Sequence, residues 1–264
     1  MSSKKETITG TLTVALLVCL VCSIIVAGAA VSLRPTQQAN SLLDKQRSIL
    51  AIAGIGDSSM SAQQVRDMFD ERIEARLVNL ESGTYSDEFE AATFDHVASS
   101  RDPALSTALT SADDIASIKR RENYSTVYVV ETDGQLDTMI LPVRGYGLWS
   151  TLHGFIALKG DLNTVAGFGF YEHGETPGLG GEGDNPRWKA MWPGKQVFAD
   201  ADSEKVAIRI IKGNVDQSSP TAKHQVDGLA GSTLTSKGVE NLLHYWLGEN
   251  GFGTFLTNQR SGEA

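Results

Sequence analysis

Residues 126–142 read TVYVVETDGQLDTMILP, and this stretch indicates the fold class. Residues 126–131 are mostly β-branched or aromatic, which favours a strand. Asp133 and Gly134 tolerate the positive φ angles of a tight hairpin turn, and residues 136–142 follow as a second apolar run. The stretch therefore predicts two antiparallel strands joined by a short turn.

A similar pattern recurs further along the chain. Residues 153–159 and 162–171 form a second predicted strand pair with Gly160 and Asp161 between them, and residues 207–211 form a fifth strand. Short turns between neighbouring strands are typical of an antiparallel sheet. Helical patterns stand before and after the strands, so the chain is predicted to be α+β, with an antiparallel sheet flanked by helices.

Four segments are predicted to be helical. Residues 40–53 space their apolar side chains at roughly helical intervals, and residues 61–80 do so after Ser61, a good N-cap. Residues 112–121 are predicted to form a short helix within an irregular acidic region, and residues 239–247 form an amphipathic helix. The apolar face of the 61–80 helix is predicted to comprise Val65, Met68, Phe69, Ile73 and Leu77.

The N-terminal segment predicts a membrane anchor. Residues 11–33 are mostly apolar and uncharged, and at 1.5 Å per residue they span roughly 35 Å, enough to cross a hydrocarbon core of about 30 Å. Lys4 and Lys5 precede them, which favours a cytoplasmic N-terminus and an exported C-terminal domain. The predicted division is 1–10 cytoplasmic N-terminus, 11–33 transmembrane helix, 34–60 membrane-exit segment and helix, and 61–264 periplasmic domain.

Three alternatives compete with the anchor. Small residues at 27–30 are compatible with a cleaved signal peptide, but the apolar run is longer than the 7–15 residues typical of a signal core. Cys19 and Cys22 raise a lipoprotein signal, but each follows a valine where a small residue is expected. A buried helix of a soluble protein is the third alternative, against which the uninterrupted length argues.

Composition excludes several classes of function. The 264 residues carry a net charge of −9, and no basic run suits nucleic-acid binding. Both cysteines lie in the apolar segment, so the domain has no internal disulfide and no thiolate metal site. His153 and His173 lack the spacing of a metal-binding pair, and no metal is expected. There is no dinucleotide fingerprint and no Walker loop.

Residues 227–236, DGLAGSTLTS, combine a Gly-rich turn with four hydroxyl side chains just before the last predicted helix. The N-terminus of a helix presents unpaired N–H groups and a partial positive charge, so it stabilises a phosphate. An ordinary helix start capped by Ser or Thr would look similar. Asp227 suits either recognition by a modifying enzyme or capping of its own turn.

Two further stretches have the character of functional loops. Residues 147–154 read GLWSTLHG, and residues 173–180 read HGETPGLG. Pro177 restricts the backbone of Thr176, and the glycines that follow permit close approach of a planar ligand. A plain surface turn is the alternative for the second stretch.

These motifs together resemble one family. The decapeptide resembles the flavinylation motif of bacterial redox membrane proteins, Asp-Gly-x-Ser-Gly-Ala-Thr-x-Thr, although this chain has Ala230-Gly231-Ser232 in place of Ser-Gly-Ala. With the apolar segment and the two loops, nearly the whole chain resembles the C subunits of the Na⁺-translocating NADH:quinone oxidoreductases. The ETPGLG stretch, residues 175–180, is shared with the G subunit of the related Rnf complex.

The resemblance implies FMN joined to Thr233 through a phosphoester, with Ser232 and Thr235 as competing hydroxyls. Loop 175–180 is implied to lie against the isoalloxazine ring. Lys212 is either a counter-charge for the phosphate or a solvated lysine, and Trp149 either stacks near the flavin or fills the core. The residues predicted to contact the cofactor are Trp149, Glu175, Thr176, Gly178, Leu179, Gly180, Lys212, Ser232, Leu234 and Thr235.

The resemblance also implies a function. In that family, FMN on the C subunit accepts an electron from an intramembrane iron–sulfur centre and passes it to the FMN of the B subunit. The implied partners are the B, D and E subunits and a flavin transferase, and the implied location is the bacterial inner membrane with the domain in the periplasm. The NADH, quinone and sodium sites belong to other subunits, so this chain needs no catalytic residue of its own. An Rnf G subunit and an anchored exported binding module without redox function are the alternatives.

Overall fold

The computed structural model describes residues 7–57, 59–200 and 205–264. The chain divides into two compact units, Met1–Asp44 and Lys45–Ala264. Lys4 and Lys5, on which the predicted orientation depends, lie outside the described residues.

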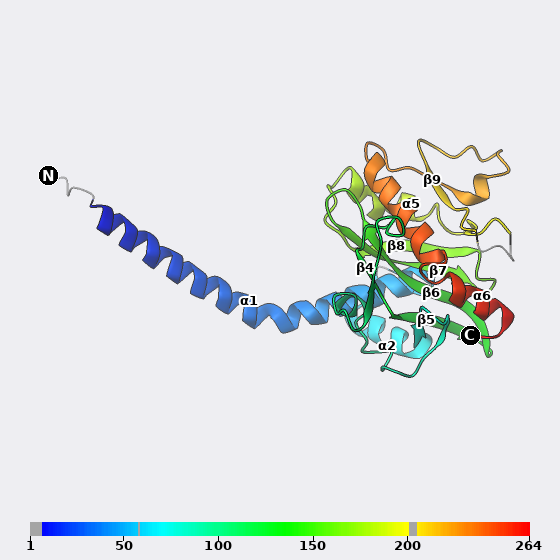
Figure 1. Ribbon diagram of the computed structural model, residues 1–264, viewed down its shortest axis with the longest axis horizontal. Coiled ribbons are helices and arrows are strands. Elements are labelled where there is room, and N and C mark those ends of the chain that lie inside the picture. The colour runs from blue at the N-terminus through cyan, green and yellow to red at the C-terminus, as the bar shows by residue number, and fades with distance from the viewer. Residues whose placement is uncertain (1–6, 58, 201–204) are drawn as a thin grey trace. The chain divides into compact units, whose positions relative to one another are not determined.

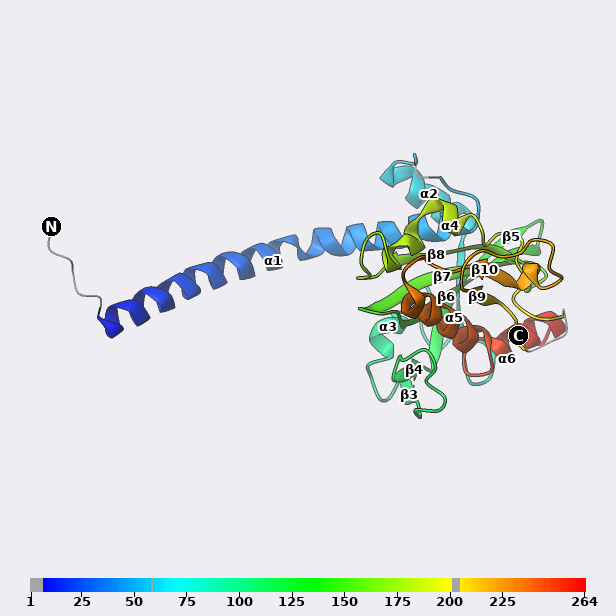
Figure 2. The same cartoon turned by 90° about the horizontal axis from the view of Figure 1, so that it is seen from above.

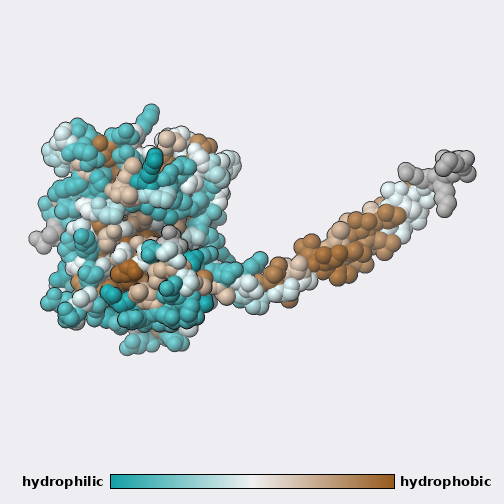
Figure 3. Space-filling model, turned by 180° about the vertical axis from the view of Figure 1, so that it is seen from behind, coloured by the Kyte–Doolittle hydropathy of each residue, from teal (hydrophilic) through white to brown (hydrophobic). Residues whose placement is uncertain are grey.

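Helix α1 (Ile8–Ile52) is 45 residues long. Its apolar part carries exposed aliphatic side chains, which form the brown band along the helix in Figure 3. By length and composition it can cross a membrane. The predicted polar exit at residues 34–39 does not end the helix, which continues through Pro35 into the predicted 40–53 segment. Glutamine and other straight-chain residues after Pro35 have good helix propensity and permit this continuation.

The larger unit is built on one antiparallel sheet of six strands in the order β2-β1-β5-β6-β7-β8 (Figure 1). The predicted hairpin is confirmed, because β5 and β6 pair directly and Asp133 and Gly134 have φ angles of 54° and 75°. The second predicted pair corresponds to β7 and β8. The strands are β1 (Glu74–Asn79), β2 (Thr84–Tyr85), β5 (Tyr124–Thr132), β6 (Gln135–Tyr146), β7 (Thr151–Lys159) and β8 (Val165–Glu172).

Helices cover both faces of this sheet (Figure 2). Helix α5 (Thr233–Leu247) packs on β6, where a Cβ at Gly145 would lie 2.6 Å from Leu242 Cβ. The end of α1 packs on the opposite face, where a side chain at Gly167 would collide with the backbone carbonyl of Ile52. The α+β prediction is confirmed, and the alternation of faces along each strand accounts for the two helical layers.

The remaining elements surround the sheet. A parallel pair, β9 and β10, lies beside α5, and an antiparallel pair, β3 and β4, leads into β5. Their bounds are α2 (Ala62–Arg72), α3 (His96–Ser99), β3 (Ser106–Ala108), β4 (Arg120–Glu122), the 3₁₀ helix η1 (Gly180–Asp184), α4 (Pro186–Lys189), β9 (Arg209–Ile211), the 3₁₀ helix η2 (Ala222–His224), β10 (Gln225–Asp227) and α6 (Gly253–Ser261).

One predicted helix is too long and another is wrong. The helix predicted at 61–80 ends at Arg72, and residues 74–79 instead form β1, which pairs along its full length with β5. Pairing with a distant strand overrides the local helical spacing. Residues 112–119 form turns and residues 120–121 belong to β4. The Asp114 carboxylate accepts the N–H groups of Ile118 and Lys119, and Lys119 has a φ of 66°, which is incompatible with a helix.

Candidate functional site

Three segments that are far apart in sequence meet at the N-terminus of α5. They are the turn 147–150 between β6 and β7, the loop 173–179 after β8, and the turn 228–232 between β10 and α5. Glu175, in the second segment, has a carboxylate that accepts hydrogen bonds from the 147–150 turn and from Thr235 in the first turn of α5. The two loops that the sequence singled out therefore lie beside the decapeptide.

Glu175 is 6% exposed, and both of its carboxylate oxygens are bonded. Oε1 accepts the backbone N–H groups of Leu148, Trp149 and Ser150 at 3.0, 2.9 and 3.2 Å. Oε2 accepts the hydroxyl of Thr235 at 2.7 Å. Burial raises the pKa of the Glu175 carboxyl, but these hydrogen bonds outweigh it, and the pKa is lowered from its ordinary value.

Two glycines leave room for this carboxylate. A Cβ at Gly147 would lie 2.6 Å from Glu175 Oε1, and a Cβ at Gly180 would lie 2.6 Å from Oε2 and 2.7 Å from Thr235 Oγ1. Such distances are shorter than any van der Waals contact. Both positions must therefore be glycine for the Glu175 carboxylate to occupy its place.

The four hydroxyl residues at the start of α5 differ sharply in exposure. Ser236 is 8% exposed, and its Oγ accepts the N–H of Leu229 at 2.9 Å. Ser232 is 4% and Thr235 1% exposed, and the Ser232 hydroxyl donates to Thr235 Oγ1 at 2.8 Å. Thr233 is exposed. Among the described residues, its hydroxyl has no hydrogen-bond partner. Of these four hydroxyls, only that of Thr233 is thus open to a reagent from solution.

Thr233 lines a cavity of about 640 Å³ between α5 and the β9–β10 pair. Arg209, Lys212 and Lys237 bring positive charge to its wall, partly balanced by Glu240, whose Oε1 lies 2.7 Å from Lys237 Nζ. The free N–H groups of the first helical turn add to this positive potential. The cavity therefore suits an anionic group next to the Thr233 hydroxyl.

Apolar side chains stand exposed around the same place. Trp149 is 66%, Leu179 44% and Leu234 63% exposed. Gly231 has a φ of +72°, and a Cβ there would lie 3.0 Å from Leu179 Cδ2, so the 228–232 turn and the 173–179 loop are in contact. Trp149 does not fill the core, which excludes one of the two sequence interpretations.

The structure places the remaining predicted residues as follows. Thr176 is exposed, and its carbonyl accepts the N–H groups of Leu179 and Gly181 at 3.1 and 3.0 Å. Gly178 has a φ of +77°, which closes that loop. The Asp227 carboxylate accepts the N–H of Val215 at 2.8 Å, so it bonds to the segment after β9 and not to its own turn.

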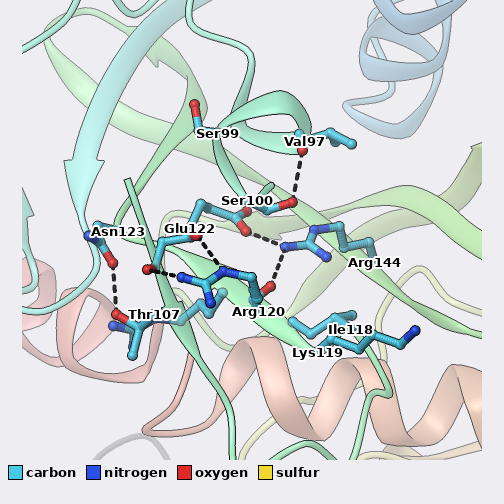
Figure 4. Close-up of polar contacts among 12 residues, drawn as sticks. Val97, Ser99, Ser100, Thr107, Ile118, Lys119, Arg120, Glu122, Asn123 and Arg144 are labelled. Carbon is cyan, nitrogen blue, oxygen red and sulfur yellow. Dashed lines mark hydrogen bonds and ion pairs between the residues drawn. The ribbon is translucent and has the colours of Figure 1, made fainter. Parts of the chain in front are cut away.

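The β6 end of the site rests on a buried ion pair. The Arg144 guanidinium points toward the Glu122 carboxylate, and its Nη2 also donates to the carbonyl of Arg120 at 3.1 Å (Figure 4). The carbonyl of Arg144 accepts Trp246 Nε1 at 2.7 Å, which joins β6 to α5. Arg144 thus fixes the strand just before the 147–150 turn to the helix that begins at Thr233.

Sequence reasoning missed three features of the site. Arg209 and Lys237 share the cavity with Lys212. Lys237 lies four residues after Thr233, a helical spacing that could have indicated it. The central position of Glu175 was also missed, because it depends on three segments meeting in space.

The comparisons with known proteins agree with this geometry. Residues 147–248 match the family model of the FMN-binding domain, and they contain all three converging segments. The chain therefore has the fold and loops of an FMN-binding domain, which follow the N-terminal apolar helix in the sequence.

Relatives specify the family. The chain is 66% identical to the C subunit of the Na⁺-translocating NADH-quinone reductase of Pseudomonas aeruginosa, over 99% of this chain and 100% of that protein. It is 50% identical to the C subunit of the Yersinia pestis reductase, over 97% and 95%. It resembles the crystal structure of Shewanella oneidensis NqrC with a TM-score of 0.75 and 34% identity, covering 86% of this chain and 99% of that one. The chain belongs to the family of C subunits of the Na⁺-translocating NADH-quinone reductases.

Proposed function

We propose that this chain is the membrane-anchored flavoprotein subunit that carries electrons within a Na⁺-translocating NADH:quinone oxidoreductase. FMN is attached to Thr233 through a phosphoester. The observation that carries the proposal is that Thr233 alone, of the four hydroxyl residues at the start of α5, is exposed, and that it lines the cationic cavity. The family membership supports the same function, and it does not favour the Rnf G subunit.

The residues present fit FMN. The N–H groups of the first turn of α5 and the Lys212 ammonium would hold the phosphate, since Lys212 lies in the same cavity wall as Thr233. Leu179, Leu234 and Trp149 offer exposed apolar surface for the ring. When bound, the flavin supplies the redox chemistry, so the protein contributes attachment, orientation and electrostatics.

The roles of the other predicted contacts divide by burial. Thr176 and Gly178 are exposed beside Leu179 and can approach the ring directly. Gly180 and Glu175 are buried, so they act through the loops that they hold. Ser232 and Thr235 are also buried, and they support the turn that presents Thr233.

The chain is anchored in the bacterial inner membrane by α1, with the N-terminus in the cytoplasm and the domain in the periplasm. Its partners are the other subunits of the complex, with the B, D and E subunits in contact, and a flavin transferase that loads the cofactor. A reporter that is active only outside the cytoplasm, fused after Ala264, should be active. Activity of a cytoplasm-only reporter at that position would reject this orientation.

Attachment is tested with the full chain made in cells that contain a flavin transferase. The unaltered chain should give a fluorescent band on a denaturing gel, and Thr233→Ala should abolish it. Ser232→Ala and Thr235→Ala are the matched controls and should keep it. Peptide mass spectrometry should find one FMN on Thr233. A dark band from the unaltered chain would favour a binding module without flavin.

A further inference from the structure

The hydroxyls at residues 232, 233 and 235 pose a problem of selection. All three lie within one helical turn, and a transferase that recognises the 227–236 stretch meets them together. Ser232 and Thr235 form a hydrogen-bonded chain, because Ser232 Oγ donates to Thr235 Oγ1 at 2.8 Å and Thr235 Oγ1 donates to Glu175 Oε2 at 2.7 Å. Thr233 stands outside this chain.

The direction of this chain is set by its last member. The Glu175 carboxylate can only accept hydrogen bonds when it is ionised, and four donors converge on it. Thr235 must therefore give its proton to Glu175, which leaves its oxygen to accept the proton of Ser232. A charged acceptor makes such bonds roughly twice as strong as neutral ones.

We propose that Glu175 is the residue that restricts flavin attachment to Thr233, by holding the hydroxyls of Thr235 and Ser232 inside the fold. The proposal rests on the proposed attachment of FMN and adds a cause for its position. Glu175 acts through the two hydroxyls and is therefore a positioning residue.

The chemistry of transfer explains why this holds. The donor is a flavin dinucleotide, in which the FMN phosphate is joined to AMP by a phosphoanhydride. A lone pair of the acceptor oxygen forms the new P–O bond, the phosphoanhydride P–O bond breaks, and AMP leaves with that electron pair. The hydroxyl proton passes to a base of the transferase. Neither buried hydroxyl can meet the donor and the base while its proton is held inside the fold.

Attachment at the wrong hydroxyl is measured in a Thr233→Ala background, with the full chain and a flavin transferase in the same cells. Thr233→Ala alone should carry no flavin. Adding Glu175→Gln should make flavin appear on Ser232 or Thr235, at about tenfold or more above the background signal of Thr233→Ala, because one charge-assisted hydrogen bond is lost. The Gln side chain keeps the size of Glu but offers an amide donor. Glu172→Gln, an exposed carboxylate nearby, should leave Thr233→Ala unlabelled.

A second variant tests the proposal without touching Glu175. Thr235→Val in the Thr233→Ala background removes the acceptor of the Ser232 hydroxyl, and flavin should then be found on Ser232. Peptide mass spectrometry assigns the site, and thermal unfolding shows that each variant is folded.

The outcomes separate this proposal from the proposed function. If both variants in the Thr233→Ala background stay unlabelled while folded, Glu175 does not select the acceptor. If Glu175→Gln alone loses flavin from Thr233, Glu175 serves recognition, and the proposal is also overturned. If the unaltered chain carries no flavin on Thr233, the attachment itself is wrong, a result seen before any Glu175 variant is made.

Discussion

Replacing Glu122 with alanine leaves the Arg144 guanidinium buried without its carboxylate partner. The side chains of Glu122 and Arg144 are 1% and 8% exposed, so water cannot take the place of the lost group. Removing one member of a buried ion pair costs about 3–5 kcal/mol. A domain of 150–250 residues loses about 2–4 °C per kcal/mol, so the unfolding midpoint should fall by about 6–20 °C.

Far-ultraviolet circular dichroism of the full chain in detergent measures this fall during heating and in urea. Lys189→Ala is the control, because its ion pair with Asp184 has side chains that are 35% and 49% exposed, and it should cost less than about 1 kcal/mol. Replacing both partners with Glu122→Leu and Arg144→Met should cost less than the sum of the single changes. A loss below about 1 kcal/mol for Glu122→Ala would refute the reasoning.

Three further predictions concern the core and the site. Burial, with Lys45 and Arg144 nearby, lowers the pKa of His96 to about 3 from its ordinary 6.5. Between these two pH values, His96 is therefore protonated in the unfolded state and neutral in the folded state. The free energy of unfolding should thus fall by about 1.4 kcal/mol per unit as pH drops from about 6.5 towards 3, and His96→Asn should flatten this slope in urea titrations. Gly231→Ala should reduce FMN attachment, measured by in-gel fluorescence, because a Cβ there presses on Leu179. The control is Gly194→Ala, which has a φ of +84° and open space around it. It shares only the backbone strain and should keep the attached FMN. Leu179→Ala should keep covalent FMN but shift its absorption and midpoint potential, whereas Ile115→Ala, of similar exposure, should change neither; unchanged spectra for Leu179→Ala would remove it from the ring site.

Local signals account for what the sequence predicted well. The β5–β6 hairpin follows from an Asp-Gly turn between two apolar runs, all within 17 residues. β1 was missed because its partner strand lies about 50 residues away in the sequence, and helical spacing was the only local signal. The sequence also placed the 147–154 and 173–180 stretches at a common site only through the family resemblance.

The difference in exposure between Thr233 and its hydroxyl neighbours could be predicted in part from the sequence. Ser232 and Thr235 are three residues apart, so in a helix they share a face, whereas Thr233 points elsewhere. Which face is buried depends on the position of β6 and of Glu175, and no local pattern contains that information. Family register was therefore needed to choose among the hydroxyls.

The crowding around the Glu175 carboxylate has an evolutionary consequence. Gly147 and Gly180 are tied to a carboxylate that leaves no space for a side chain, and Thr235 is tied to it by its hydroxyl. Where residue 175 has a shorter side chain, positions 147 and 180 can both accept residues other than glycine. Where Glu175 is present, neither glycine can be replaced. Positions 147, 175, 180 and 235 should therefore be inherited as a block, even where the surrounding loops drift.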